Sequence, residues 1–557
     1  MTRPERPARK LHPAVIIIAC ALLSAALYVP ALKYALVWDD VDLVTLSRSA
    51  PLDAFGQSFW QGGSTRFLGD DPYYRPLVNL TIGIEKLGNA TAPLKFHLGN
   101  IGLHALAVAL FGFVAWQMFR SRWATGLAAL LFGLHPLLAD NVAYVSGRTD
   151  LLAAIGLLTA LLGLMRFTRR SDATGIVITV AGFALALFSK ETGALFVLIV
   201  PVWLLATRRS RRLRLKDWFL FAGLFVVLAG YTAARIAVLG RLLPATAGGG
   251  AFNYPLLAMS EFGRLLGMFA LPISGRIFLW PASFTPFTPF LIITLAWLLV
   301  PLAIRKRGLP AETGLAWLWV LIFLLPIAGL TRFGPLGRLL YVPAIGLILL
   351  AILAARTAIM NRRKLGRPLV ALGAFVCLAF VPLARNRMAV WHDGYALFTR
   401  MTTEAPLNPA GHFNLALALR GRNDADGALA EYSRVIQLDS TVALAYSNAA
   451  ALLQAKGAFA EAANLYRKTL SLAPDYPLAH NNLGIILYKL GDIPGAITEL
   501  RRALELAPKD AGAAYNLARI YGQAGRADSA GILLEQAYRL QPDNPQIKEA
   551  WRQSGHR

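Results

Sequence analysis

Two adjacent carboxylates, Asp39 and Asp40, directly follow an apolar segment at residues 13–32. That segment is long enough to cross a bilayer once, so both side chains are expected at or just below a membrane surface. A carboxylate in this position is costly to desolvate, which makes it a candidate functional residue. Next to a substrate hydroxyl it could act as a general base. The alternative interpretation is a helix stop, because Asp prefers water to lipid.

Further charged and polar residues stand at the ends of other apolar segments, on the side predicted to face away from the cytosol: Asp140, Asn141, Arg148, Asp150, Lys190, Glu191, Arg332 and Arg338. Any one of them alone can be interpreted as an ordinary interfacial residue. Together they predict a cavity that contains fixed cations and carboxylates. Cations at the membrane edge suit a lipid phosphate, and a carboxylate beside them suits a base that deprotonates an acceptor hydroxyl.

The composition predicts a membrane protein with room for a second, soluble domain. The 557-residue chain is 56% hydrophobic and 16% charged, with a mean hydropathy of +0.50. Soluble globular proteins are close to a quarter charged. The net charge of +25 argues for membrane orientation rather than for a nucleic-acid partner, because Arg and Lys cluster in short loops between apolar segments. These clusters lie at residues 3–10, 120–122, 166–170, 208–216, 305–307 and 356–367.

Hydropathy and charge bias together predict about eleven membrane crossings within a domain at 1–384. The predicted crossings lie at residues 13–32, 98–118, 123–139, 150–166, 173–189, 193–207, 217–239, 286–304, 312–330, 338–355 and 368–384. An odd number places the N-terminus in the cytosol and the C-terminus outside it. The long outer loop at 33–97 is predicted to include an amphipathic helix near 77–87 that lies on the membrane.

Beyond about residue 385 the long apolar segments end, and small residues recur with a period of 34. The columns that keep this period are Asn414, Asn448, Asn482 and Asn516; Ala428, Ala462, Ala496 and Ala530; and Gly457, Gly491 and Gly525, with Asn423 in the first copy. This period is typical of tetratricopeptide repeats, in which stacked helix pairs form a groove. We predict a linker at 385–407, four repeats at 408–545 and a tail at 546–557. The groove suits an extended protein or peptide partner.

The remaining motifs limit the chemistry. The sequence has no phosphate-binding glycine loop, nucleophile elbow or HExxH motif, so ATP-driven transport and soluble hydrolysis lack support. His97, His104 and His135 are interpreted as structural, because no second ligand stands at metal spacing. No tightly bound cofactor is predicted, and the need for a divalent metal is left open.

Several short motifs occur in a fixed order along the whole chain: Trp38-Asp39-Asp40, Tyr74-Arg75-Pro76-Leu77, His135-Pro136, Gly147-Arg148-Thr149-Asp150-Leu151-Leu152, Ser189-Lys190-Glu191-Thr192-Gly193, Arg338-Leu339-Leu340-Tyr341-Val342-Pro343, Trp391-His392-Asp393 and Asn408-Pro409. In this order the chain resembles the transmembrane-and-tetratricopeptide-repeat (TMTC-type) protein O-mannosyltransferases of the GT-C glycosyltransferase superfamily. One position departs from the family pattern. An acidic residue usually precedes Arg338, and here that residue is Gly337.

The resemblance implies an all-α fold, with a polytopic GT-C-type membrane bundle followed by a tetratricopeptide-repeat solenoid. It also implies that mannose or another hexose moves, with inversion, from a polyprenyl-phosphate donor to Ser or Thr hydroxyls of exported proteins. Asp39 is the expected base, and Asp40 positions it or substitutes for it. The residues expected at the donor phosphate are Arg75, Arg148, Asp150, Lys190, Glu191, Arg338 and Tyr341. The compact, basic character suggests a bacterial inner-membrane protein with periplasmic repeats and an undecaprenyl donor.

Two other functions stay open at this point. The chain could be a GT-C transferase or ligase that acts on envelope glycan or lipid, although a repeat groove favours a protein partner. It could also be a membrane-anchored scaffold without enzymatic activity. The carboxylate pair separates the two classes, because a scaffold should tolerate Asp39→Asn and a transferase should not.

Overall fold

The computed structural model describes residues 11–38, 40, 74–86, 92–207, 213–240, 255–272, 288–299, 311–330 and 336–554. Throughout these ranges the chain forms helices and turns and contains no strand, which confirms the predicted all-α class. The chain divides into two compact units, Met1–Arg400 and Met401–Arg557, which we call the membrane unit and the repeat unit. Each unit is described separately.

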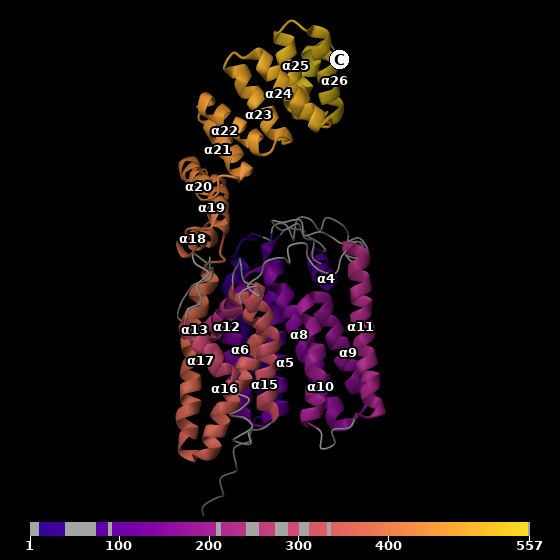
Figure 1. Ribbon diagram of the computed structural model, residues 1–557, viewed down its shortest axis with the longest axis vertical. Helices are drawn as coiled ribbons and strands as arrows, with labels where there is room; N and C mark the ends of the chain where they lie inside the picture. Colours follow the sequence, from indigo (N-terminus) through magenta and orange to yellow (C-terminus); the bar gives the residue numbers. More distant parts are fainter. Residues whose placement is uncertain are drawn as a thin grey trace, which may run out of the picture. The chain divides into compact units, whose positions relative to one another are not determined.

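Long helices of the membrane unit run side by side (Figure 1). In chain order they are α1 (Pro13–Leu27), α5 (Pro93–Phe119), α6 (Arg122–Leu134), α8 (Arg148–Arg170), α9 (Ala173–Ser189), α10 (Phe196–Thr207), α11 (Leu215–Leu239), α12 (Pro255–Ala270), α13 (Thr288–Leu298), α15 (Ala311–Leu330), α16 (Tyr341–Asn361) and α17 (Gly366–Ala389). Shorter helices connect them: η1 (Val29–Lys33), α4 (Pro76–Glu85), η2 (Pro136–Leu138), α7 (Ala139–Ala143), η3 (Val145–Gly147), η4 (Glu191–Leu195), η6 (Leu336–Leu340) and η7 (Arg363–Leu365).

Each of the predicted crossings coincides with an apolar helix or helix pair. Among the described residues, five helices are long and apolar enough to cross a membrane: Pro93–Phe119, Val145–Arg170, Leu215–Leu239, Gly337–Asn361 and Arg363–Ala389. A sixth candidate is a pair bent by 50°, Arg122–Leu134 with Pro136–Ala143. The remaining apolar helices are shorter, so the number of crossings stays a prediction. In the first predicted crossing, α1 ends at Leu27 and a 3-10 helix containing Pro30 follows.

Helices α8 and α9 are in close contact because glycines remove the side chains between them. A Cβ atom on Gly156 would lie 2.4 Å from the backbone nitrogen of Ala186. A Cβ atom on Gly182 would lie 2.4 Å from the backbone nitrogen of Ala160. Small residues at such crossings let helix backbones approach in a membrane, where no hydrophobic effect drives helices together. This contact fixes the start of α8 relative to the end of α9.

Several basic loops gather at one end of these helices. Arg122 Nε, at the start of α6, donates a hydrogen bond to the carbonyl of Leu11 at 2.8 Å. Lys216 Nζ, at the start of α11, donates to the carbonyl of Ser171 at 2.9 Å. Ser171 follows α8, so the predicted site residues at the start of α8 lie at the opposite end of the bundle. The separation of basic loops from candidate site residues therefore follows from the helix order.

The predicted linker and tail contain helices. α17 continues to Ala389, and α18 (Gly394–Glu404) lies within the stretch 385–407 that was predicted as a linker. Its apolar side chains Leu397 and Phe398 are buried. In the predicted tail, α27 (Pro545–Gln553) packs Ile547 against α25 (Ala511–Gln523) and α26 (Ala527–Leu540) and so covers the end of the core. Burial of these apolar side chains explains why both stretches are helical.

The repeat unit consists of four consecutive helix pairs followed by α27: α19 (Pro409–Gly421) with α20 (Ala425–Leu438), α21 (Ala443–Ala455) with α22 (Phe459–Leu472), α23 (Pro477–Lys489) with α24 (Ile493–Leu506), and α25 (Ala511–Gln523) with α26 (Ala527–Leu540). The predicted glycine column marks the turn inside each pair. Asn423, Gly457, Gly491 and Gly525 all have positive φ, between 62° and 88°. Glycine adopts this left-handed conformation without steric cost, and Asn is the side-chain residue that tolerates it best.

The alanine column is mostly buried, and three of the four residues in the asparagine column contact the preceding repeat. Ala428, Ala462 and Ala496 are fully buried, whereas Ala530 in the last repeat is only partly buried. Asn482 Nδ2 donates to the Tyr466 hydroxyl of the preceding repeat at 3.1 Å, and Asn516 Nδ2 donates to Asn481 Oδ1 at 3.0 Å. In contrast, Asn414 Nδ2 bonds to the carbonyl of Ala410 in its own helix. Asn448 Oδ1 lies 3.5 Å from Arg420 Nη1 of the first repeat.

Candidate active site

The segment before the carboxylate pair holds a bulky residue in a left-handed backbone conformation. Trp38 has φ of 51°, and its ring lies edge-on to Phe398 with a centroid distance of 6.1 Å. Such a conformation is rare for a large side chain and persists only where its surroundings enforce it, which is common at functional sites. Asp39, the first-choice base, lies outside the described residues, as does Arg332.

Asp40 is fully buried and holds the turn that precedes α8. Its Oδ1 accepts hydrogen bonds from the backbone nitrogen of Ser146 at 2.7 Å and from the Ser146 hydroxyl at 2.8 Å. Its Oδ2 accepts a bond from the backbone nitrogen of Val145 at 3.1 Å. These donors belong to the first residues of η3, which have no helical partner of their own. Asp40 therefore links the segment after α1 to the start of α8.

Arg148 is also fully buried and joins α8 to two other helices. Nε donates to Asn100 Oδ1 at 2.9 Å, and Nη2 donates to the carbonyl of Phe96 at 2.9 Å, both on α5. Nη1 forms an ion pair with Glu85 Oε2, at the end of α4, at 2.7 Å. Burial raises the pKa of the Glu85 carboxyl, and the Arg148 guanidinium opposes that rise. The fork of Arg148 thus fixes α4 and α5 to the start of α8.

The break between α9 and η4 carries two oppositely charged neighbours that reach different partners. Lys190 forms an ion pair with Asp150 on α8. Glu191 Oε2 accepts from Arg75 Nη2 at 3.0 Å, and Glu191 Oε1 lies 3.3 Å from Arg235 Nη1 on α11. Four of the predicted site residues therefore lie in two adjacent ion-pair groups. Arg235 extends the second group and was not predicted.

Arg338 lies in η6, close to these groups. Its guanidinium carbon stands 5.8 Å from the centroid of the Tyr144 ring, a cation–π distance. Its carbonyl accepts a hydrogen bond from Asn141 Nδ2 at 3.0 Å. Both Arg75 and Arg338 contribute to the positive potential at Lys190. Within the described ranges, Arg338 has no carboxylate partner.

Tyr341 lies directly after η6 but contacts different residues. It is fully buried, and its hydroxyl lies 2.7 Å from His104 Nδ1. His104 Nε2 lies 3.0 Å from the carbonyl of Gly133. Because a carbonyl only accepts, Nε2 carries the hydrogen and Nδ1 of the neutral ring accepts from the Tyr341 hydroxyl. Tyr341 therefore connects α16 to α5 and α6, and His104 has the structural role that the sequence predicted.

A further ion pair, buried on both sides, was not predicted from the sequence. Asp140 and Arg387 form two hydrogen bonds, Nε to Oδ1 at 2.9 Å and Nη2 to Oδ2 at 2.7 Å. Trp391 Nε1 also donates to Asp140 Oδ1, at 3.0 Å. Arg387 and Arg235 could have been predicted as site residues from the sequence, because each is a charged residue within an apolar helix. The sequence does not show which carboxylate each of them reaches.

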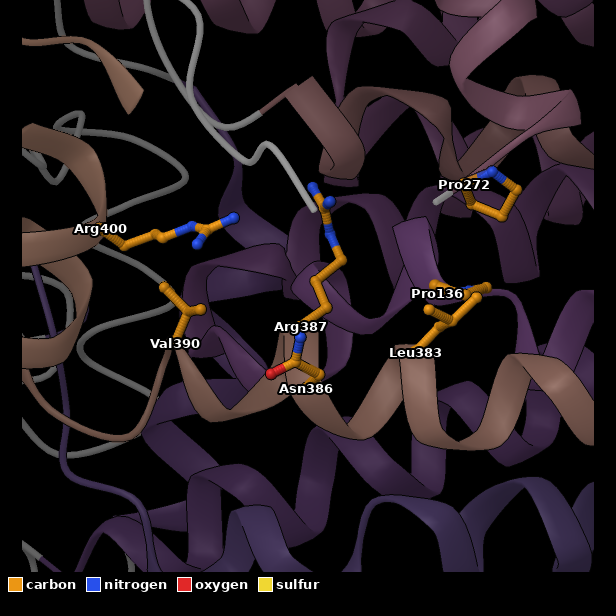
Figure 2. Close-up of a pocket in the computed structure, with 7 residues that line it drawn as sticks. All are labelled: Pro136, Pro272, Leu383, Asn386, Arg387, Val390 and Arg400. Carbon is orange, nitrogen blue, oxygen red and sulfur yellow. The ribbon is translucent and has the colours of Figure 1, made fainter. Parts of the chain in front are cut away.

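A cavity of about 70 Å³ is lined in part by Arg387 (Figure 2). Its lining combines two guanidinium groups with an amide and apolar side chains: Pro136, Pro272, Leu383, Asn386, Arg387, Val390 and Arg400. No group of three or more His, Cys, Asp or Glu side chains suited to a metal ion occurs in the part of the chain that the structure describes.

The fold and the site define a helical membrane protein with a charged site at one end of its bundle, joined to a tetratricopeptide array. The tetratricopeptide-repeat family model matches residues 447–511 and 486–545. Among solved structures, that of MamA has a TM-score of 0.26 and 18% identity, covering 28% of this chain and 88% of that one. TTC0263 from Thermus thermophilus has a TM-score of 0.25 and 21% identity, covering 35% of this chain and 97% of that one.

Curated relatives confirm the resemblance to the TMTC-type family. The chain is 28% identical to protein O-mannosyl-transferase Tmtc1 of Drosophila melanogaster over 50% of this chain and 35% of that protein. It is 32% identical to TMTC3 of Mus musculus over 32% of this chain and 20% of the relative. The protein O-mannosyl-transferase F38B6.6 of Caenorhabditis elegans is 25% identical over 75% of this chain and 62% of its own length. The chain thus matches less than two thirds of each of these relatives.

Proposed function

We propose that this chain is a membrane glycosyltransferase that moves mannose, or another hexose, from a polyprenyl-phosphate donor to Ser or Thr hydroxyls of exported proteins. Two findings support this proposal. The relatives that match the chain are named as protein O-mannosyl-transferases. The repeat unit is of a kind that offers a groove to extended protein segments.

The observation that carries the proposal is a cluster of cations at one end of the bundle. Among the described residues, the cations Arg75, Lys190, Arg235 and Arg338 lie around the carboxylates of Asp150 and Glu191. A phosphate that remains on the lipid after transfer would be stabilised by these cations. Guanidinium groups suit such a ligand, because they form paired, charge-assisted hydrogen bonds to phosphate oxygens. Arg338 is the leading contact because its charge has no carboxylate partner within the described ranges.

The proposed reaction is a single inverting displacement. The acceptor oxygen forms a bond to the anomeric carbon while the bond from that carbon to the phosphate oxygen breaks. The hydroxyl proton passes to Asp39, and the lipid phosphate leaves against the cations. Asp40 is buried and its carboxylate already accepts three hydrogen bonds. This supports a division of roles in which Asp39 is the base and Asp40 positions the segment that carries it.

The proposed orientation puts the N-terminus in the cytosol and the repeats in the periplasm of a bacterial inner membrane. It rests on the basic loops and the odd number of predicted crossings. A reporter fused after residue 557 should then read as periplasmic, and one inserted within 208–216 should read as cytosolic. A cytosolic reading for the C-terminal reporter would contradict the orientation.

Intact-mass glycoproteomics of envelope proteins, with and without the gene, tests the proposed activity. The expected result is the loss of hexose from Ser or Thr in specific exported proteins. Loss of sugar from an envelope glycan or lipid, with proteins unchanged, would instead support a transferase or ligase with a different acceptor. If no sugar is lost from any fraction, the proposal is wrong and the scaffold function is favoured.

A further inference from the structure

The Asp140–Arg387 pair lies deep inside the membrane unit. Their side chains are 0% and 4% exposed, and the residues stand 247 positions apart in the sequence. The pair joins α7 to α17, and Figure 2 shows the Arg387 side chain among the residues that line the cavity. Removing two charges from water costs about as much as their attraction returns, so a buried ion pair contributes little net stability.

One set of contacts connects Asp140 to the guanidinium of Arg338. Trp391 donates its indole N–H to Asp140 at 3.0 Å. The Trp391 ring stacks on the Tyr144 ring, with centroids 4.7 Å apart and planes at 26°. Arg338 in turn lies over the Tyr144 ring. Because Tyr144 and Trp391 are fully buried, the stack has little freedom to shift.

A second set of contacts connects the pair to the backbone of η6. A Cβ atom on Gly337 would lie 2.2 Å from Asp140 Oδ2 and 2.7 Å from Arg387 Nη2. The same atom would lie 2.8 Å from the carbonyl of Leu137. Since heavy atoms that are not bonded rarely approach within 3.0 Å, even alanine does not fit at position 337 without movement. The residue before Arg338 is therefore seated directly against the ion pair.

We propose that Asp140 and Arg387 are positioning residues for Arg338, and that they set where its guanidinium meets the donor phosphate. The pair acts on the side chain through Trp391 and Tyr144 and on the backbone through Gly337. The proposal rests on the phosphate role given to Arg338 in the proposed function. It also accounts for the glycine at 337, because an acidic side chain there would collide with the carboxylate that Asp140 already supplies.

This geometry predicts that position 337 can supply the carboxylate partner of Arg387 in place of position 140. In the double variant Asp140→Ala with Gly337→Asp, the new carboxyl group starts from a Cβ position already 2.7 Å from Arg387 Nη2. Loss of the Asp140 oxygens clears the closest contact, and a shift of the flexible Arg387 guanidinium away from the new Cβ then lets the two groups pair, while the 2.8 Å approach to the Leu137 carbonyl remains. Gly337→Ala alone adds bulk without removing the obstacle, and Asp140→Ala alone leaves Arg387 without this carboxylate. Both single variants should displace η6.

The test compares these variants with Arg338→Gln as full-length protein in nanodiscs. Donor KM and kcat are measured with polyprenyl-phosphate-mannose and a Ser/Thr peptide, and binding of undecaprenyl phosphate is measured separately. We expect each single variant and Arg338→Gln to raise the donor KM about tenfold or more, as expected for a weakened charge-assisted contact. We expect the double variant to return KM to within about threefold of the original, a rescue that general destabilisation would not produce.

Gly175→Ala is the matched control, since it adds a Cβ at a tight contact of α9, 2.7 Å from Phe167 Cα on α8, at the end of these helices that lies opposite the site. It should lower protein yield without changing the donor KM. If Arg338→Gln raises KM but Gly337→Ala does not, or if the double variant is no better than Asp140→Ala, the positioning proposal is wrong. If Arg338→Gln itself leaves KM and undecaprenyl phosphate binding unchanged, the phosphate role of Arg338 fails instead, and the positioning proposal falls with it.

Discussion

Oδ1 of Asp40 accepts two hydrogen bonds from Ser146, one from its backbone nitrogen at 2.7 Å and one from its hydroxyl at 2.8 Å. The two residues are 106 positions apart, and their contact places the segment after α1 against the start of α8. Asp40 is therefore a carboxylate with a structural role.

Asp40→Asn should destabilise the membrane unit. The amide keeps one acceptor oxygen but cannot serve both Ser146 and the backbone nitrogen of Val145. A buried donor left without its partner costs about 1–3 kcal/mol. The thermal melting temperature of the detergent-solubilised protein should fall, whereas the exposed control Asp426→Asn should leave it unchanged. Equal melting temperatures for Asp40→Asn and the original would show that the carboxylate is not structural.

Arg338→Gln and Lys190→Gln should separate donor binding from stability. Arg338 has no carboxylate partner within the described ranges, so its loss should raise the donor KM and leave the melting temperature close to the original. Lys190 pairs with Asp150, which is only 5% exposed, so its removal leaves a buried charge. Breaking a buried pair in this way costs about 3–5 kcal/mol. If both variants lose stability equally, Arg338 has a partner that this account omits.

Arg148→Lys should destabilise the protein although it conserves charge. Lysine offers a single nitrogen, whereas the Arg148 guanidinium reaches Asn100, Phe96 and Glu85 in different directions. Loss of these contacts should release α4, which limited proteolysis within α4 would detect. Arg148→Lys with the protease sensitivity of the original would mean that charge alone holds α4 in place.

Local sequence patterns predicted the elements well. The 34-residue period placed the four helix pairs, and its glycine column fell on the positive-φ turns at Gly457, Gly491 and Gly525. These features depend on residues close together in sequence, because each repeat contacts only its neighbours. Apolar length and basic loops likewise placed the helices of the membrane unit.

Long-range pairing within the site could not be predicted from the sequence. Arg387 lies in an apolar helix with nothing nearby to indicate Asp140, and Arg235 likewise gives no sign of Glu191. The sequence also grouped Arg148 with the phosphate-binding cations, whereas the structure gives it three protein partners. Which carboxylate neutralises which cation depends on how the helices pack, and periodicity carries no information on that.

Ala496→Leu should weaken the repeat unit by about 1–3 kcal/mol through overpacking, because Ala496 is fully buried between stacked helices. Hydrogen–deuterium exchange of α23 and α24 in the full-length protein measures the effect. The same change at Ala530, which keeps the period but is only partly buried, serves as the matched control and should have a smaller effect. Equal exchange at both sites would show that burial does not set the cost.

The most direct test of the central claim is the rate at which Asp39→Asn transfers mannose from polyprenyl-phosphate-mannose to a Ser/Thr peptide. Asparagine keeps the shape of the side chain but cannot accept the hydroxyl proton. We expect the rate to fall by about 10²–10⁴, with protein yield, melting temperature and binding of undecaprenyl phosphate unchanged. If Asp39→Asn transfers mannose at the original rate, Asp39 is not the base. If the double variant with Asp40→Asn also does so, the carboxylate pair only ends a helix and the proposed mechanism is wrong.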